Sequence, residues 1–209
     1  MEFNTTDQEE IEILKKWWGE NGTSLITGVA VGLALLFGWK GWHQYIDNQG
    51  MAASQYFEQM SSALIQKQSE KAEGVGHQLI DQYPSTIYAA NGALALAALK
   101  VEQGEGAAAR VHYQWVVENS SFDSPRQLAQ LGIARTYLDE GNLDQALRQL
   151  SVESKGIYRS HFSEVKGDVL RQQGELSAAT TAFADALQLA DGTDTRRELL
   201  QMKLDEVKQ

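Results

Sequence analysis

The feature that most constrains the fold is an uncharged stretch of 19 residues, 21–39, near the N-terminus of this 209-residue chain. As a helix rising about 1.5 Å per residue, the stretch would span about 28 Å, close to the ~30 Å hydrocarbon core of a bilayer. Four of the five tryptophans bracket it, namely Trp17, Trp18, Trp39 and Trp42. Amphipathic rings favour the level of the lipid headgroups. We therefore predict a transmembrane helix over 21–43, between an N-terminal segment of 1–20 and a C-terminal domain of 44–209.

The apolar stretch has two other interpretations, a buried helix of a soluble core and a cleaved signal peptide. A core helix does not need tryptophan pairs at both ends. A signal peptide begins with a short basic region, whereas residues 1–20 contain six acidic residues and two lysines. We therefore expect an uncleaved single-pass anchor. Lys15 and Lys16 before the span, against Lys40 at its far edge, favour a cytoplasmic N-terminus.

Within the span, Gly28 and Gly32 form a GxxxG pattern. Small residues at this spacing let two membrane helices approach closely, so we predict a partner-docking face there. The alternative is that glycine is simply common in membrane helices. Ahead of the span, Asn21-Gly22 predicts the end of a short amphipathic helix, unless residues 1–20 form a disordered tail.

The domain after the anchor contains an internal repeat. Gly104, Gly141 and Gly174 stand between helical patterns, 37 and 33 residues apart. Each glycine has a small residue seven positions before it, an alanine five positions after it and a large apolar residue nine positions after it. These are Ala97, Ala134 and Gly167, then Ala109, Ala146 and Ala179, then Tyr113, Leu150 and Phe183. A helix–turn–helix period of about 34 residues is the tetratricopeptide pattern.

We therefore predict an all-α protein, with one transmembrane helix followed by a tetratricopeptide-like solenoid of about three to four helical hairpins. A degenerate first unit covers 52–84, with Lys67 at the turn position, and a closing helix covers 195–208. Only two prolines and many alanines and leucines agree with an all-helical chain. The alternative is a generic helical bundle.

Composition argues against several function classes. The net charge of −10 argues against a nucleic-acid partner, and the sequence contains no cysteine for disulfides or thiolate metal ligands. None of the four histidines has a partner in a recognisable metal motif, and no catalytic or phosphate-binding motif is present. We predict a non-enzymatic protein with no cofactor and no metal.

The first helices of such repeats line a concave surface. The predicted phase places an apolar groove for a partner helix or nonpolar peptide at Leu94, Leu128, Leu131, Arg135 and Leu138. The same phase adds Asn91, Ala98, His161, Glu164, Asp168 and Arg171 to this surface. The alternative is that the leucines belong to the core because the phase is wrong by one position.

The layout as a whole resembles the YfgM family. The resemblance covers 10–202 and rests on Glu20-Asn21-Gly22 leading into the span, Gly38-Trp39 closing it, weak tetratricopeptide repeats, and Gln201-Met202-Lys203 near the end. Members are single-pass proteins of the bacterial inner membrane with a periplasmic C-terminal domain.

The resemblance implies a non-enzymatic ancillary subunit of the SecYEG translocon. Such a subunit would bind the periplasmic chaperone PpiD and help to pass translocated, unfolded secretory proteins to periplasmic chaperones. The family offers no catalytic residue to look for. The alternative function is a membrane-anchored adaptor for a cell-envelope or division assembly.

Overall fold

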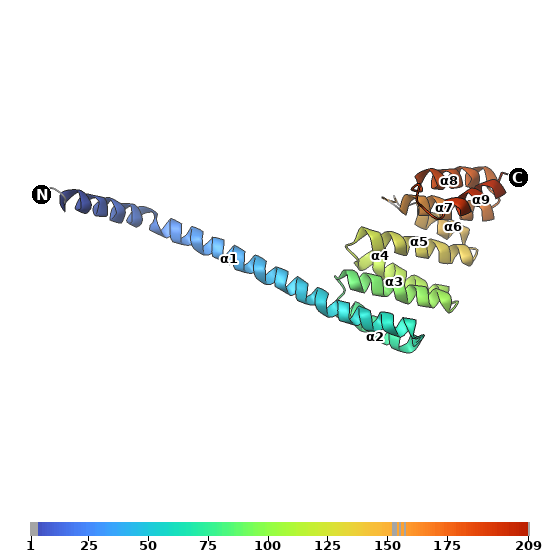
Figure 1. Ribbon diagram of the computed structural model, residues 1–209, viewed down its shortest axis with the longest axis horizontal. Coiled ribbons are helices and arrows are strands. Elements are labelled where there is room, and N and C mark those ends of the chain that lie inside the picture. The colour runs from blue at the N-terminus through green and yellow to red at the C-terminus, as the bar shows by residue number, and fades with distance from the viewer. Residues whose placement is uncertain (1–3, 152–153, 155, 157, 209) are drawn as a thin grey trace. The chain divides into compact units, whose positions relative to one another are not determined.

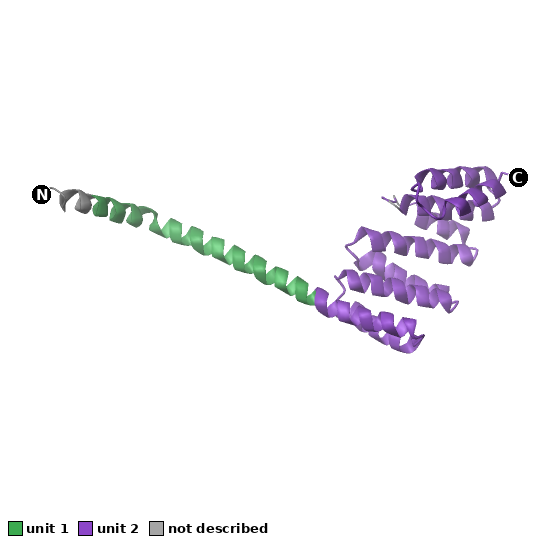
Figure 2. Cartoon of the chain, in the orientation of Figure 1, with its two compact units in different colours: residues 1–49 green, residues 50–209 purple. Residues whose placement is uncertain are grey.

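The computed structural model describes residues 4–151, 154, 156 and 158–208, with side chains from residue 10 onward. Two units, residues 1–49 and 50–209, make up the chain (Figure 2). Every regular element of the described residues is an α-helix. The all-α prediction is therefore confirmed.

Helix α1, Asn4–Ile65, begins in the first unit and ends in the second. The predicted helix end at Asn21-Gly22 is wrong. The Asn21 side-chain amide donates a hydrogen bond to the Trp17 carbonyl oxygen at 3.1 Å, which is helical spacing, and the Trp18 ring covers Gly22. No proline interrupts the segment, so no residue there lacks the backbone N–H that the helix needs.

The apolar part of α1 exposes its side chains. Leu35 and Phe37 are each 70% exposed. Among the described helices, α1 alone is long and apolar enough to cross a membrane. Its length and its exposed apolar side chains make it a candidate membrane span.

The second unit consists of antiparallel helix pairs packed one after another along the chain (Figure 1). Residues 50–65 of α1 precede α2, and α9 follows the last pair. The bounds are α2 Ser69–Gln82, α3 Ile87–Glu102, α4 Gly106–Asn119, α5 Asp123–Asp139, α6 Leu143–Leu150, α7 Tyr158–Gln172, α8 Leu176–Leu189 and α9 Arg197–Glu206. Four pairs and a closing helix within the described residues agree with the predicted solenoid.

The repeat positions have the roles that their spacing predicts. Gly104, Gly141 and Gly174 turn the chain with φ of 77°, 76° and 82°, a conformation that costs glycine little because it has no Cβ. The three alanines five residues later are all fully buried. In the last pair, a Cβ added to Gly167 would lie 2.6 Å from the Phe183 ring. The small residue thus makes room for the large one.

Lys67 takes the place of a turn glycine in the first pair. Its φ is 56°, and the next amide, that of Gln68, donates to the Ala63 carbonyl at 2.8 Å. The amide that follows Gly104 bonds in the same way, from Glu105 to the Lys100 carbonyl at 2.8 Å. A residue with a Cβ is strained in this left-handed conformation by about 1–2 kcal/mol.

We expect Lys67→Gly to raise the free energy of unfolding by about 0.5–1 kcal/mol, because relief of strain exceeds the entropy that glycine adds to the unfolded chain. Urea unfolding of the full chain in detergent measures this change. The matched control is Lys71→Gly in α2, which should lower stability by about 1 kcal/mol. A loss of stability in Lys67→Gly would contradict the assignment of the turn.

Candidate functional site

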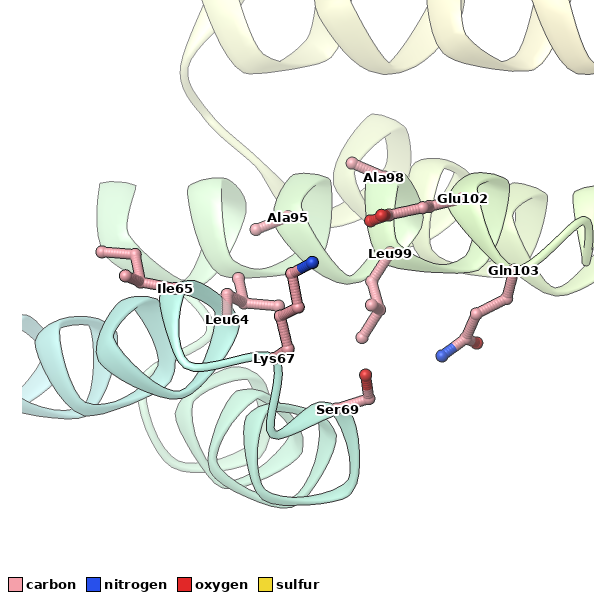
Figure 3. A pocket seen from close by; sticks show the side chains of 9 residues that line it. All are labelled: Leu64, Ile65, Lys67, Ser69, Ala95, Ala98, Leu99, Glu102 and Gln103. Atoms are coloured by element: carbon pink, nitrogen blue, oxygen red, sulfur yellow. The ribbon is translucent and has the colours of Figure 1, made fainter.

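Two cavities lie on either side of α3 in the second unit. The first, of about 530 Å³, lies between the end of α1 and α3 and is lined by Leu64, Ile65, Lys67, Ser69, Ala95, Ala98, Leu99, Glu102 and Gln103 (Figure 3). The second, of about 400 Å³, lies between α3 and α5 and is lined by Leu94, Ala98, Val101, Tyr113, Leu128, Gly132, Arg135, Thr136 and Asp139. Ala98 lines both cavities. We call them together the α3 groove.

The α3 groove has an apolar surface and a charged rim. Ile65 is 83% exposed, Val101 42% and Leu128 40%. Glu102 and Asp139 lie at the last residues of α3 and α5, where the helix dipoles are also negative. Lys67 lines the same cavity as Glu102 and Arg135 the same cavity as Asp139, so the charges of the rim are balanced and the groove can accept nonpolar side chains.

Four of the residues that the predicted concave surface contains line this groove. They are Leu94, Ala98, Leu128 and Arg135. Residues 128 and 135 lie two turns apart, so they share one face of α5.

Leu131 is a correction to the predicted groove. It is 1% exposed and belongs to a core cluster with Ala134 and Val165, and Leu138 packs against the same cluster. Three residues after Leu128, the chain has turned about 300°, so Leu131 points about 60° away from the groove face. For these two leucines the alternative interpretation, a core position, holds.

The groove also contains Tyr113, Val101 and Ile65, which were not predicted to line it. Tyr113 reaches it from α4 because a Cβ added to Gly132 would lie 2.4 Å from its ring, so the glycine gives the ring space. Burial raises the pKa of the Tyr113 hydroxyl. The pairing of a large residue in one hairpin with a glycine in the next is the signal that could have found it.

The residues of α7 that were predicted to line the concave surface do not face an open groove. Three of them form ion pairs with α9 and the residue before it. Glu164 accepts from the Arg196 guanidinium at 2.6 Å and from the Lys203 ammonium at 2.9 Å, and Lys203 also lies 2.7 Å from Asp168. Arg171 lies 2.9 Å from Glu206. His161 is half-buried beside Tyr158. We call these ion pairs the α7–α9 cluster.

Opposing effects act on Glu164, which is 6% exposed. Burial raises the pKa of its carboxyl, but Lys203 and Arg196 together outweigh burial and hold the pKa below its usual range. The carboxylate is therefore ionised at neutral pH. The ion pairs of the α7–α9 cluster thus hold α9 against α7 at the C-terminal end of the solenoid.

Gly28 and Gly32 lie in the first unit, on the exposed surface of α1. A Cβ added to either glycine would meet nothing within 4 Å. The described residues contain no group of three or more His, Asp or Glu side chains that could hold a metal ion.

This architecture is shared with known proteins. The tetratricopeptide repeat-like domain family matches residues 15–209. Three relatives bear the name "Ancillary SecYEG translocon subunit". They come from Haemophilus influenzae (24% identical), Escherichia coli (22%) and Neisseria gonorrhoeae (29%). The first two alignments cover 98% of both chains and the third covers 100% of both. The resemblance inferred from the sequence is confirmed.

Two solved structures share the fold. PilF of Pseudomonas aeruginosa has a TM-score of 0.61 at 18% identity over 77% of this chain and 69% of its own. A tetratricopeptide repeat protein of Parabacteroides merdae has a TM-score of 0.59 at 14% identity over 76% of this chain and 61% of its own. With its repeat turns, its paired helices and a match that runs from residue 15 to the last residue, the chain belongs to the tetratricopeptide repeat-like domain family.

Proposed function

We propose that this protein is a non-enzymatic ancillary subunit of the SecYEG translocon, anchored in the inner membrane by a single span in α1. The observation that carries the proposal is the alignment over 98–100% of the chain with three relatives that have this name. Anchor and repeats are aligned together, so the shared feature is the whole architecture rather than a widespread repeat domain.

The proposal places the N-terminus in the cytoplasm and the repeat unit in the periplasm. Lys15 and Lys16 before the span, against Lys40 at its far edge, support this orientation. A reporter that is active only outside the cytoplasm should be active when fused after Gln209 and inactive when fused before Lys15. The reverse pattern would contradict the orientation.

The α3 groove is the proposed contact for PpiD and for unfolded secretory proteins. Its exposed apolar side chains suit a nonpolar segment of a partner, since a helix or extended peptide can bury its own apolar face there. Through this contact the subunit would pass translocated proteins to periplasmic chaperones.

We expect the double variant Val101→Glu/Leu128→Glu to reduce co-purification of PpiD at least tenfold, because it adds two charges to the apolar surface. Both side chains are already exposed, so the fold should persist. The matched control is Val111→Glu/Leu176→Glu, at exposed positions outside the groove (67% and 50% exposed). Quantitative mass spectrometry after mild detergent extraction measures both. Equal loss of PpiD in both variants, or in neither, would contradict the role of the groove.

Gly28 and Gly32 are the proposed contact within the membrane. Replacing both with leucine should keep the protein in the membrane but weaken its association with SecYEG, because bulky side chains separate helices that small residues let touch. Unchanged co-purification of SecY with this variant would remove the docking role from the two glycines. Leucine for Val29 and Val31, which lie next to Gly28 and Gly32 respectively, is the control.

A further inference from the structure

Two histidines from successive hairpins of the solenoid lie next to each other. His77 on α2 and His112 on α4 have ring centroids 5.6 Å apart, with ring planes inclined at 43°. His77 is exposed and His112 is half-buried. Solvent can therefore reach the pair while packing restrains one ring. Neither residue lines the α3 groove, and the proposed function uses neither.

We propose that His77 and His112 form a two-histidine site for a divalent transition-metal cation such as Zn²⁺, Ni²⁺ or Cu²⁺. An imidazole nitrogen binds such a cation at about 2.0–2.1 Å, which puts the metal about 3.2 Å from the ring centroid. Two centroids separated by 5.6 Å then subtend about 120° at the metal, close to the tetrahedral angle. Water would complete the coordination.

An ion pair lies beside the two histidines. Glu73 lies one turn before His77 on α2, and its carboxylate is 2.9 Å from the Lys100 ammonium. Lys100 is also 3.3 Å from Glu105. The Glu73 carboxylate and the Lys100 ammonium both act on His112, so their charges offset each other there. Because Lys100 already holds Glu73, only the two imidazoles are assigned as protein ligands.

The ligand type selects the class of metal. Imidazole nitrogens suit zinc, nickel and copper, whereas magnesium and calcium prefer oxygen ligands. The two histidines are 35 residues apart in the sequence and are brought together only by the packing of α2 on α3 and of α3 on α4. The metal would therefore bind the folded chain in preference to the unfolded one and stabilise it.

Thermal unfolding of the full chain in detergent, purified without a polyhistidine tag, tests the site. Ni²⁺ at about ten times its Kd should raise the Tm by about 3–5 °C, and Mg²⁺ should not. His77→Gln, at an exposed position, should weaken Ni²⁺ binding at least tenfold without unfolding the protein. His43→Gln, on α1, is the matched control and should bind Ni²⁺ like the wild type.

Electron paramagnetic resonance of the Cu²⁺-loaded chain gives a second measurement. We expect couplings to two imidazole nitrogens in the wild type and to one in His77→Gln. The proposal is overturned if 1 mM Ni²⁺ leaves the wild-type Tm unchanged. It is equally overturned if His77→Gln and the wild type show the same nickel shift and the same copper spectrum.

Discussion

Ala179→Glu should lower the free energy of unfolding by about 3–5 kcal/mol, because it buries a carboxylate in an apolar cluster. Ala179 is fully buried and packs in a cluster with Phe183, Leu170, Leu204 and Val207, all of them apolar. A domain of this size has about 5–15 kcal/mol of stability in total. We expect a large fall in Tm or loss of the cooperative transition, measured by thermal unfolding of the full chain in detergent.

The matched control is Ala184→Glu, on the exposed side of the same helix. This change should alter the free energy of unfolding by less than about 0.5 kcal/mol. Equal tolerance of the two substitutions would show that the repeat phase is wrong, and the assignment of the α3 groove would fail with it.

Glu164→Gln should lower the free energy of unfolding by about 3 kcal/mol at pH 7, because it leaves Arg196 and Lys203 without their shared carboxylate. Asp194 and Asp168 still contact these two cations, so the folded state should persist. Chemical unfolding of both proteins at a series of pH values measures the difference. Glu198→Gln, at an exposed position of α9, is the control and should have little effect at any pH.

The difference between wild type and Glu164→Gln should depend on pH in a defined direction. The pKa of Glu164 is lower in the folded chain than the ordinary value of 4.5. The stabilisation by its ion pairs is therefore complete above the unfolded pKa and is lost as the pH falls through the folded pKa. We expect the difference between the two unfolding free energies to shrink as the pH falls below 4.5 and to close once the pH is below the folded pKa. A constant difference down to pH 3 would contradict the role of the carboxylate.

The helical repeat could be predicted because its constraints are local in sequence. A glycine between two helical patterns requires a turn, and the alanine five residues later requires close packing, so Gly104, Gly141 and Gly174 fixed the phase of their hairpins. Lys67 shows that tertiary packing can impose the same turn without glycine. The predicted stop at Asn21-Gly22 failed because asparagine and glycine lower helix propensity without preventing the helix as a proline would.

The groove was only partly predictable, because neighbouring faces of one helix differ by small rotations. Leu128 and Leu131 are both apolar and three residues apart, and the sequence does not show which of the two faces the core. Contacts between residues far apart in the sequence could not be predicted. Glu164 meets Arg196 across 32 residues, and His77 meets His112 across 35, so no short motif could connect them.

Site-specific photo-crosslinking from position 98 tests the central claim most directly. Ala98 is exposed and lines both cavities of the α3 groove, so a photoreactive residue there would project into the groove. We expect adducts with PpiD or a SecYEG subunit in intact cells, and none of them from Gln114, which is exposed on α4 outside the groove. No adduct from position 98, the same adducts from both positions, or adducts only with proteins of an envelope or division assembly would contradict the account.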